Sequence, residues 1–133
     1  MKIAIVGDPH IATGFRARVD DYLHTVLNKI KYIASENDAV IFLGDVFDTS
    51  AMPTYVFNTT YKELAPFKGK LHTILGNHDM KNLKENSKQY FTHITHQMQI
   101  QIDGWVLYMN HVPFLCYSGV WSHKRKIAQA FGH

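Results

Sequence analysis

The chain has 133 residues, of which 46% are hydrophobic and 19% charged, with a formal net charge of +3. This composition excludes a disordered tail and predicts one globular domain over residues 1–133. The single cysteine excludes a disulfide framework and a zinc site of the CxxC type. No apolar run reaches the roughly 20 residues of a membrane span, and the chain opens on a strand-like run, so we expect a cytoplasmic protein without membrane contact.

Hydrophobic periodicity predicts strands and helices that alternate along the chain. Strands are expected at residues 2–6, 39–43 and 71–75, and helices at 16–35, 55–64 and 81–90. Apolar residues then alternate over 98–102 and 105–109 on either side of Asp103-Gly104, a strong hairpin signal, and a last strand is expected at 127–133. This order predicts a parallel core of three strands with an added antiparallel hairpin, and therefore an α/β layer fold.

Side chains that commonly bind metal ions follow the predicted strands. The clusters are Asp8-Pro9-His10, Gly44 to Asp48, Gly76 to Asp79 and Asn110-His111. Because ligands bind at the carboxyl ends of parallel strands, we expect the clusters to converge. Carboxylates, imidazoles and an amide without thiolates suit Mn, Fe, Zn or Mg, and a shared carboxylate such as Asp45 can bridge two ions.

Each cluster taken alone is ordinary turn chemistry, and only their conjunction at one end of successive strands favours a metal site. The glycines before Asp45 and Asn77 are expected to let the backbone turn sharply and approach a bound anion.

Together the clusters resemble the signature of the calcineurin-like metallophosphoesterase family: Asp-x-His, Gly-Asp-x-x-Asp, Gly-Asn-His-Asp/Glu, a lone His and Gly-His-x-His. The match covers essentially the whole chain. The resemblance implies an α/β/β/α sandwich of two sheets, the second of them incomplete. It also implies a metal-dependent phosphoesterase with two divalent ions, Mn first and Fe, Zn, Ni or Mg as alternatives, acting on a phosphate ester with a phosphodiester favoured.

Two groups within this family are similar to different parts of the chain. Gly44 to Asp48, and the predicted helix that opens with Arg16 and Arg18, resemble the nuclease subunits of double-strand-break repair. The run from His111 through Phe114 to Gly132-His133 is more similar to compact phosphoesterases of phage and bacteria. A nuclease acting on DNA or RNA, and a catalytically silent binding module with an incomplete metal site, therefore stay open as alternatives.

Carried over residue by residue, the resemblance implies a role for each motif residue. The ligands implied are Asp8 and His10 for the first ion, Asp45 as the bridge, and Asn77, His111 and His133 for the second ion. His78 would donate a proton to the leaving oxygen, Asp79 would orient the ring of His78, and Asp48 would fix the orientation of a ligand.

The sequence departs from the family pattern at Gly132-His133, where the last motif is cut in half. The final histidine of that motif, a ligand of the first ion in the family, and the strands after it are absent. We expect a domain truncated at its C-terminal metal motif, either a fragment of a longer protein or one completed by a second polypeptide, with decay of the site as the third interpretation. An incomplete sheet would leave an unpaired edge, which predicts a homo-oligomer or a partner chain that completes the sheet and the metal site.

Overall fold

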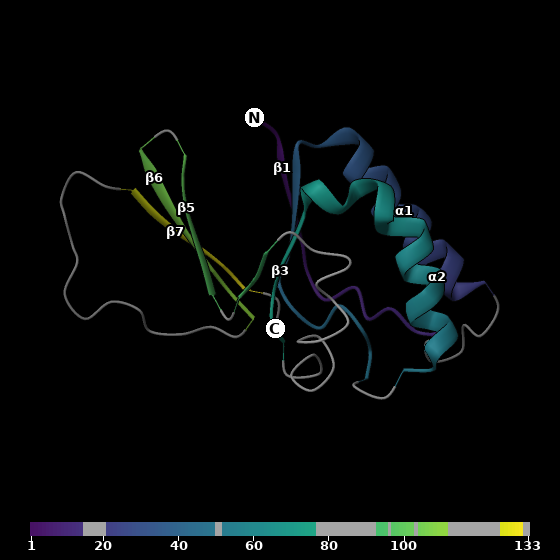
Figure 1. Cartoon of the computed structure of the whole chain (residues 1–133). Helices are drawn as coiled ribbons and strands as arrows, with labels where there is room; N and C mark the ends of the chain where they lie inside the picture. Colours follow the sequence, from purple (N-terminus) through teal and green to yellow (C-terminus); the bar gives the residue numbers. More distant parts are fainter. Residues whose placement is uncertain are drawn as a thin grey trace.

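The computed structural model of the protein describes residues 1–14, 21–49, 52–76, 93–95, 97–102, 104–111 and 126–131. Within these residues two β-sheets pack face to face, and helices cover the outer face of the first sheet (Figure 1). The same part of the chain contains no helix with the length and apolar character needed to cross a membrane.

The first sheet is parallel and has the strand order β1-β2-β3-β4. Its strands are β1 (Ile3–Val6), β2 (Ala39–Phe42), β3 (Leu71–Ile74) and β4 (His93–Thr95). The predicted three-strand core is therefore confirmed, with one strand added. The sequence did not predict β4, because a run of three residues is too short to show periodicity.

Helix α1 (Tyr22–Glu36), helix α2 (Thr54–Leu64) and the 3-10 helix η1 (Ala65–Lys70) form the helical layer. Helix α1 was expected to begin at Arg16, but residues 15–20 lie outside the described residues. The helix expected at 81–90 lies outside them too, so the described helices cover only the first sheet.

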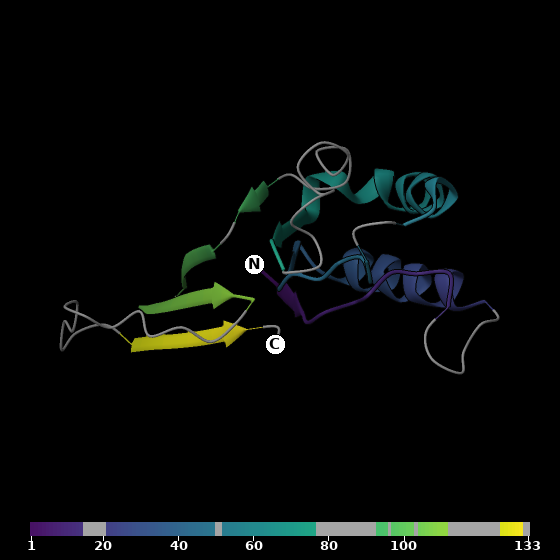
Figure 2. The same ribbon diagram turned by 90° about the horizontal axis from the view of Figure 1, so that it is seen from below.

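The second sheet is small and has the strand order β5-β6-β7 (Figure 2). Strands β5 (Gln97–Ile102) and β6 (Trp105–Asn110) form the predicted antiparallel hairpin, and Gly104 in its turn has a positive φ of 79°. Strand β7 (Lys126–Phe131) pairs in parallel with β6. Two packed sheets with helices outside confirm the predicted α/β sandwich of the metallophosphoesterase type.

Strand β2 lies in the middle of the sandwich and is buried on both faces. Val40 and Phe42 pack into the core beneath α1 and α2, whereas Ile41 and Leu43 pack between the sheets against Met109 of β6. A strand covered on both faces is apolar at every position, which explains the unbroken apolar run in the sequence. This double burial fixes where β2 ends and therefore where the polar residues after it begin.

Polar contacts hold the helices to each other and to the sheet. The Lys70 ammonium at the end of η1 donates hydrogen bonds to the carbonyl oxygens of Ala34 (3.1 Å) and Asn37 (3.0 Å), where α1 ends. Carbonyl groups at a helix C-terminus attract a cation, so Lys70 stabilises this end of α1. Lys31 of α1 pairs with Glu63 of α2.

Replacing Glu63 with glutamine tests the contact between α1 and α2. The hydrogen bond from Lys31 and the lysine charge lower the pKa of Glu63 below its ordinary value. A carboxylate with a lowered pKa in the folded state contributes stability that is fully present above the ordinary pKa of glutamate, and this is lost as the pH falls through the lowered pKa. We expect Glu63→Gln to reduce the thermal midpoint only slightly at neutral pH, because partly exposed ion pairs contribute little to stability. In strong acid Glu63 is protonated and the substitution should not change the midpoint. Thermal unfolding followed by circular dichroism across this pH range measures the difference, and an equal reduction at every pH would contradict it.

Candidate metal centre

The loops that follow β1 and β2 are joined by backbone hydrogen bonds. The amides of His10 and Ile11 donate to the carbonyl oxygens of Asp45 (3.1 Å) and Val46 (2.7 Å), and the amide of Asp48 donates to the carbonyl of Ile11 (3.1 Å). The first two predicted clusters therefore form one unit at the carboxyl edge of the sheet.

Two predicted site residues have a left-handed backbone conformation. His10 has φ 47° and Asp45 has φ 45°, values that non-glycine residues seldom adopt. Such a conformation persists only where the surroundings hold it, and the hydrogen bond between the His10 amide and the Asp45 carbonyl joins these two residues directly. The directions of the His10 and Asp45 side chains are therefore set by strained backbone conformations that the two loops hold in place.

Asp8, Asp45 and His111 converge at this edge. One ligand atom from each lies within 4.8 Å of the other two, and no other group of three or more such side chains occurs among the described residues. Asp45 and His111 are buried, with 2% and 4% of their surfaces exposed, and the Asp8 side chain is 16% exposed. The expected convergence of the first, second and fourth clusters is therefore observed.

The hydrogen bonds of His111 set the orientation of its ring. Its Nδ1 lies 2.9 Å from the carbonyl oxygen of Leu43, and its amide donates to Oδ1 of Asn110 (2.9 Å). A carbonyl oxygen can only accept, so Nδ1 carries the proton and Nε2 of the neutral ring is left with its lone pair. Nε2 is thus the atom with which His111 can bind a metal ion. The Leu43 carbonyl had no signal in the sequence, because every residue carries this group.

The donor atoms fit a cation. Nε2 of His111 lies 3.4 Å from Oδ2 of Asp45, and both atoms present lone pairs when the ring is neutral. Ligand atoms about 2.1 Å from a transition-metal ion stand about 3.0–3.4 Å apart, so one ion can contact both. Oδ1 of Asp8 is buried without a hydrogen-bond partner among the described residues, which costs free energy that a bound cation would offset.

Two glycines leave room for these side chains. A Cβ atom at Gly76 would lie 2.1 Å from Oδ1 of Asp45, and a Cβ atom at Gly44, whose φ is 97°, would lie 2.6 Å from Nδ1 of His111. The sequence predicted that the glycines would allow close approach of an anion. The structure shows that the protein's own ligand side chains occupy this space.

His10 lies beside the group of three and contacts Asp48. Its Nδ1 is 3.2 Å from Oδ1 of Asp48, and the use of Asp48 to orient a ligand stays a prediction. His10 is not part of the group formed by the other three side chains, so its role as a metal ligand stays a prediction. Asn77, His78, Asp79 and His133 lie outside the described residues, and their roles are likewise predictions.

Comparisons with known proteins identify the family of the chain. The sequence profile of the calcineurin-like phosphoesterases matches residues 1–131, and the chain belongs to that family. Among curated proteins, none matches the chain.

Two solved structures share the fold. YfcE, a phosphoesterase from E. coli, is 19% identical and superposes with a TM-score of 0.57 over 84% of this chain. The nuclease MPE of Pseudomonas putida is 16% identical, with a TM-score of 0.56 over 96% of this chain. The chain spans 58% of the length of each of these two proteins.

Gly76→Ala tests whether the Asp45 carboxylate needs the space that Gly76 leaves. The added methyl group would lie 2.1 Å from Oδ1 and 2.3 Å from the amide nitrogen of Asp45, so the carboxylate must move. We expect the affinity for Mn²⁺ to fall roughly 10–100-fold, as when a group that orients a ligand is lost. Calorimetric titration with Mn²⁺ measures this loss.

The matched control is Gly69→Ala, because no atom lies within 4 Å of a Cβ atom added at Gly69. Its affinity for Mn²⁺ should equal that of the unaltered chain. Equal affinities in all three proteins would show that Gly76 has no part in positioning Asp45.

Proposed function

We propose that this chain is a metal-dependent phosphoesterase that hydrolyses a phosphodiester with the help of two divalent ions, Mn²⁺ being the first candidate. The observation that carries the proposal is the convergence of Asp8 with the buried Asp45 and His111 in a chain of the calcineurin-like phosphoesterase family. Its carboxylate and imidazole donors are of the type that binds Mn, Fe, Zn, Ni or Mg. Divalent ions held there would neutralise charge on the phosphate and lower the pKa of the attacking water.

The described residues would do three kinds of work in this reaction. Asp45, which is buried just after the central strand, would share its two oxygens between the ions. His111 would bind through Nε2, since Nδ1 is hydrogen-bonded to Leu43. Asp48 would hold the ring of His10 through the contact at Nδ1 and so leave Nε2 of His10 to act as a ligand.

The remaining roles rest on the family motif. Asn77 and His133 would complete the second ion's ligands, and His10 would join Asp8 at the first. His78 would protonate the leaving oxygen, with Asp79 orienting its ring. The cytoplasm stays the predicted location.

Substitutions at Asp45 and His78 separate metal binding from proton donation. Asp45→Asn keeps the shape of the side chain and removes its charge, so we expect bound Mn²⁺ and hydrolysis to be lost together. His78→Ala should keep the metal and lower the turnover by roughly 10²–10⁴, the usual contribution of a general acid. Elemental analysis, together with hydrolysis of a chromogenic phosphodiester, measures both effects. Unchanged rates in both variants would refute the proposed mechanism.

The same assay distinguishes the alternatives when labelled DNA and RNA are added as substrates with Mn²⁺. Hydrolysis of the small diester supports the proposal. Cleavage of the nucleic acid alone, with an affinity that falls steeply with salt, identifies a nuclease. Metal content below about half an ion per chain without hydrolysis of any substrate identifies a silent binding module, since two-metal chemistry needs an occupied site.

A further inference from the structure

The backbone of His10 is hydrogen-bonded to two different elements. Its amide donates to the carbonyl oxygen of Asp45 (3.1 Å), in the loop that follows β2. Its own carbonyl oxygen accepts a hydrogen bond from the hydroxyl of Tyr22, the first residue of α1 (3.3 Å). His10, a predicted ligand of the first ion, is thus connected to the helical layer as well as to the loop of the central strand.

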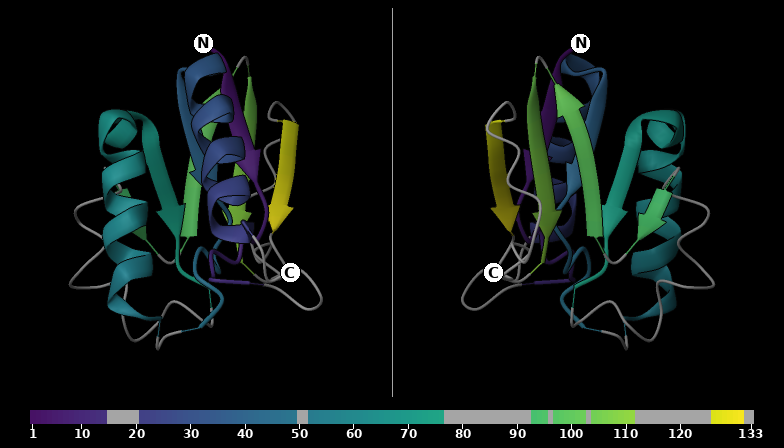
Figure 3. Two further views of the ribbon diagram at one scale, coloured as in Figure 1. Left: turned by 90° about the vertical axis from the view of Figure 1, so that its right-hand side faces the viewer. Right: turned by 90° about the vertical axis from the view of Figure 1, so that its left-hand side faces the viewer.

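Helix α1 is a firm support for the Tyr22 side chain. Figure 3 shows α1 running back along the first sheet, with its first turn toward the ends at which the strand arrows point. Leu23 and Leu27 in this half of the helix are buried, and both belong to the core beneath the helices. The half-buried Tyr22 therefore extends from a backbone that close packing holds in place.

The peptide group between His10 and Ile11 is held at both of its polar atoms. Its oxygen accepts the bond from Tyr22, and its nitrogen, the amide of the fully buried Ile11, donates to the carbonyl oxygen of Val46 (2.7 Å). The orientation of this peptide group defines the ψ angle of His10, a residue whose φ is 47°. A side chain in this left-handed region keeps its conformation only while its surroundings hold it.

The same peptide group lies close to the metal ligands along the chain. Asp8 is two residues before His10, and the His10 amide is bonded directly to the backbone of Asp45. Bound ions require ligand distances within about 0.2 Å of their preferred values. A rotation of this peptide group would therefore disturb donor atoms on two loops at once.

We propose that Tyr22 is a positioning residue of the metal centre. Its hydroxyl holds the peptide group after His10 in the orientation that keeps the donor atoms of Asp8, His10 and Asp45 at the spacing a divalent ion requires. The inference rests on the proposed function, because it takes these three side chains as metal ligands. Tyr22 acts through the backbone of His10 and not by contact with the ion.

Tyr22→Phe removes the hydroxyl and keeps the ring, so it tests the hydrogen bond with the packing retained. We expect the affinity of the full chain for Mn²⁺ to fall about five-fold, the usual effect of losing one neutral hydrogen bond. Calorimetric titration measures this loss. It is performed well below the thermal midpoint of each variant, where nearly all chains are folded, so that a change in stability alone leaves the affinity unaltered.

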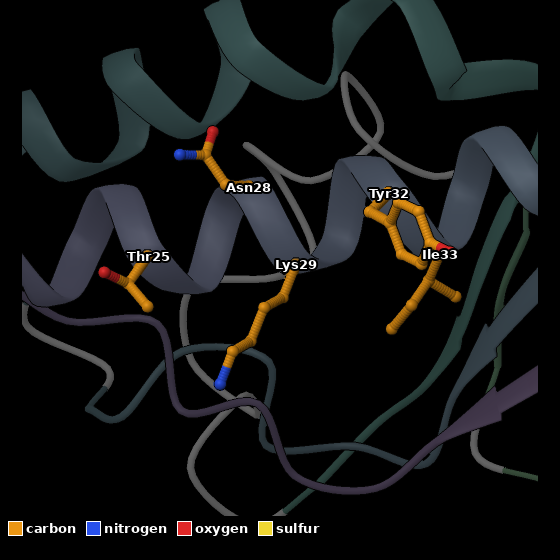
Figure 4. Close-up of a pocket in the computed structure, with 5 residues that line it drawn as sticks. All are labelled: Thr25, Asn28, Lys29, Tyr32 and Ile33. Carbon is orange, nitrogen blue, oxygen red and sulfur yellow. The ribbon is translucent and has the colours of Figure 1, made fainter.

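The matched control is Tyr32→Phe in the same helix, about 15 Å further along its axis. Tyr32 is 68% exposed and lines an open hollow on α1 together with Thr25, Asn28, Lys29 and Ile33 (Figure 4). Loss of its hydroxyl should leave the affinity for Mn²⁺ unchanged.

A second measurement needs no ion. In the metal-free chain, the carbonyl ¹³C resonance of His10 should move in Tyr22→Phe, because the hydroxyl bonded to that carbonyl is gone, and should stay in place in Tyr32→Phe. An unmoved resonance, an unchanged Mn²⁺ affinity in Tyr22→Phe or an equal loss in both variants overturns the inference. Failure of the proposed function is seen elsewhere, because the unaltered chain would then bind no Mn²⁺, and the role of Tyr22 would fall with it.

Discussion

The burial of the Asp45 carboxylate at the end of the central strand is the constraint on which the metal centre depends. Strand β2 is covered on both faces, so the chain leaves it inside the protein and the first acidic side chain is almost wholly removed from water. A buried carboxylate is costly unless it is paired or binds a metal. Gly76 leaves room for the Asp45 carboxylate, and Asp8 and His111 converge beside it. The left-handed conformations of His10 and Asp45 belong to the same turns.

The apolar cores offset the cost of this arrangement. The core beneath the helices and the core between the sheets both include alternate residues of β2, so the strand cannot shift along its axis without exposing one of them. The register of β2 with β1 and β3 fixes where along the sheet the loops after these strands begin. The packing thereby determines the distances between ligand atoms that come from three separate loops.

The carboxyl edge of the first sheet holds a buried side-chain atom, Oδ1 of Asp8, that has no hydrogen-bond partner among the described residues. It belongs to the same group as the carboxylate of Asp45 and the imidazole of His111, whose ligand atoms have the spacing of metal ligands. A cation would supply the missing partner, so the chemistry of this atom points to a metal ion.

The sequence by itself determined the strands other than β4, the hairpin and the candidate ligands Asp8, Asp45 and His111. Short-range periodicity and residue type carry this information, and Asp8, Asp45 and His111 were recognisable before their positions were known. Only the tertiary structure decided which atoms meet. The tertiary structure brings together segments that are far apart in the chain. Examples are the bond from His111 to the Leu43 carbonyl, the fit of Gly76 against Asp45 and the contact of His10 with Asp48. Their distances are set by the packing of the whole sandwich, which no local pattern of residues encodes.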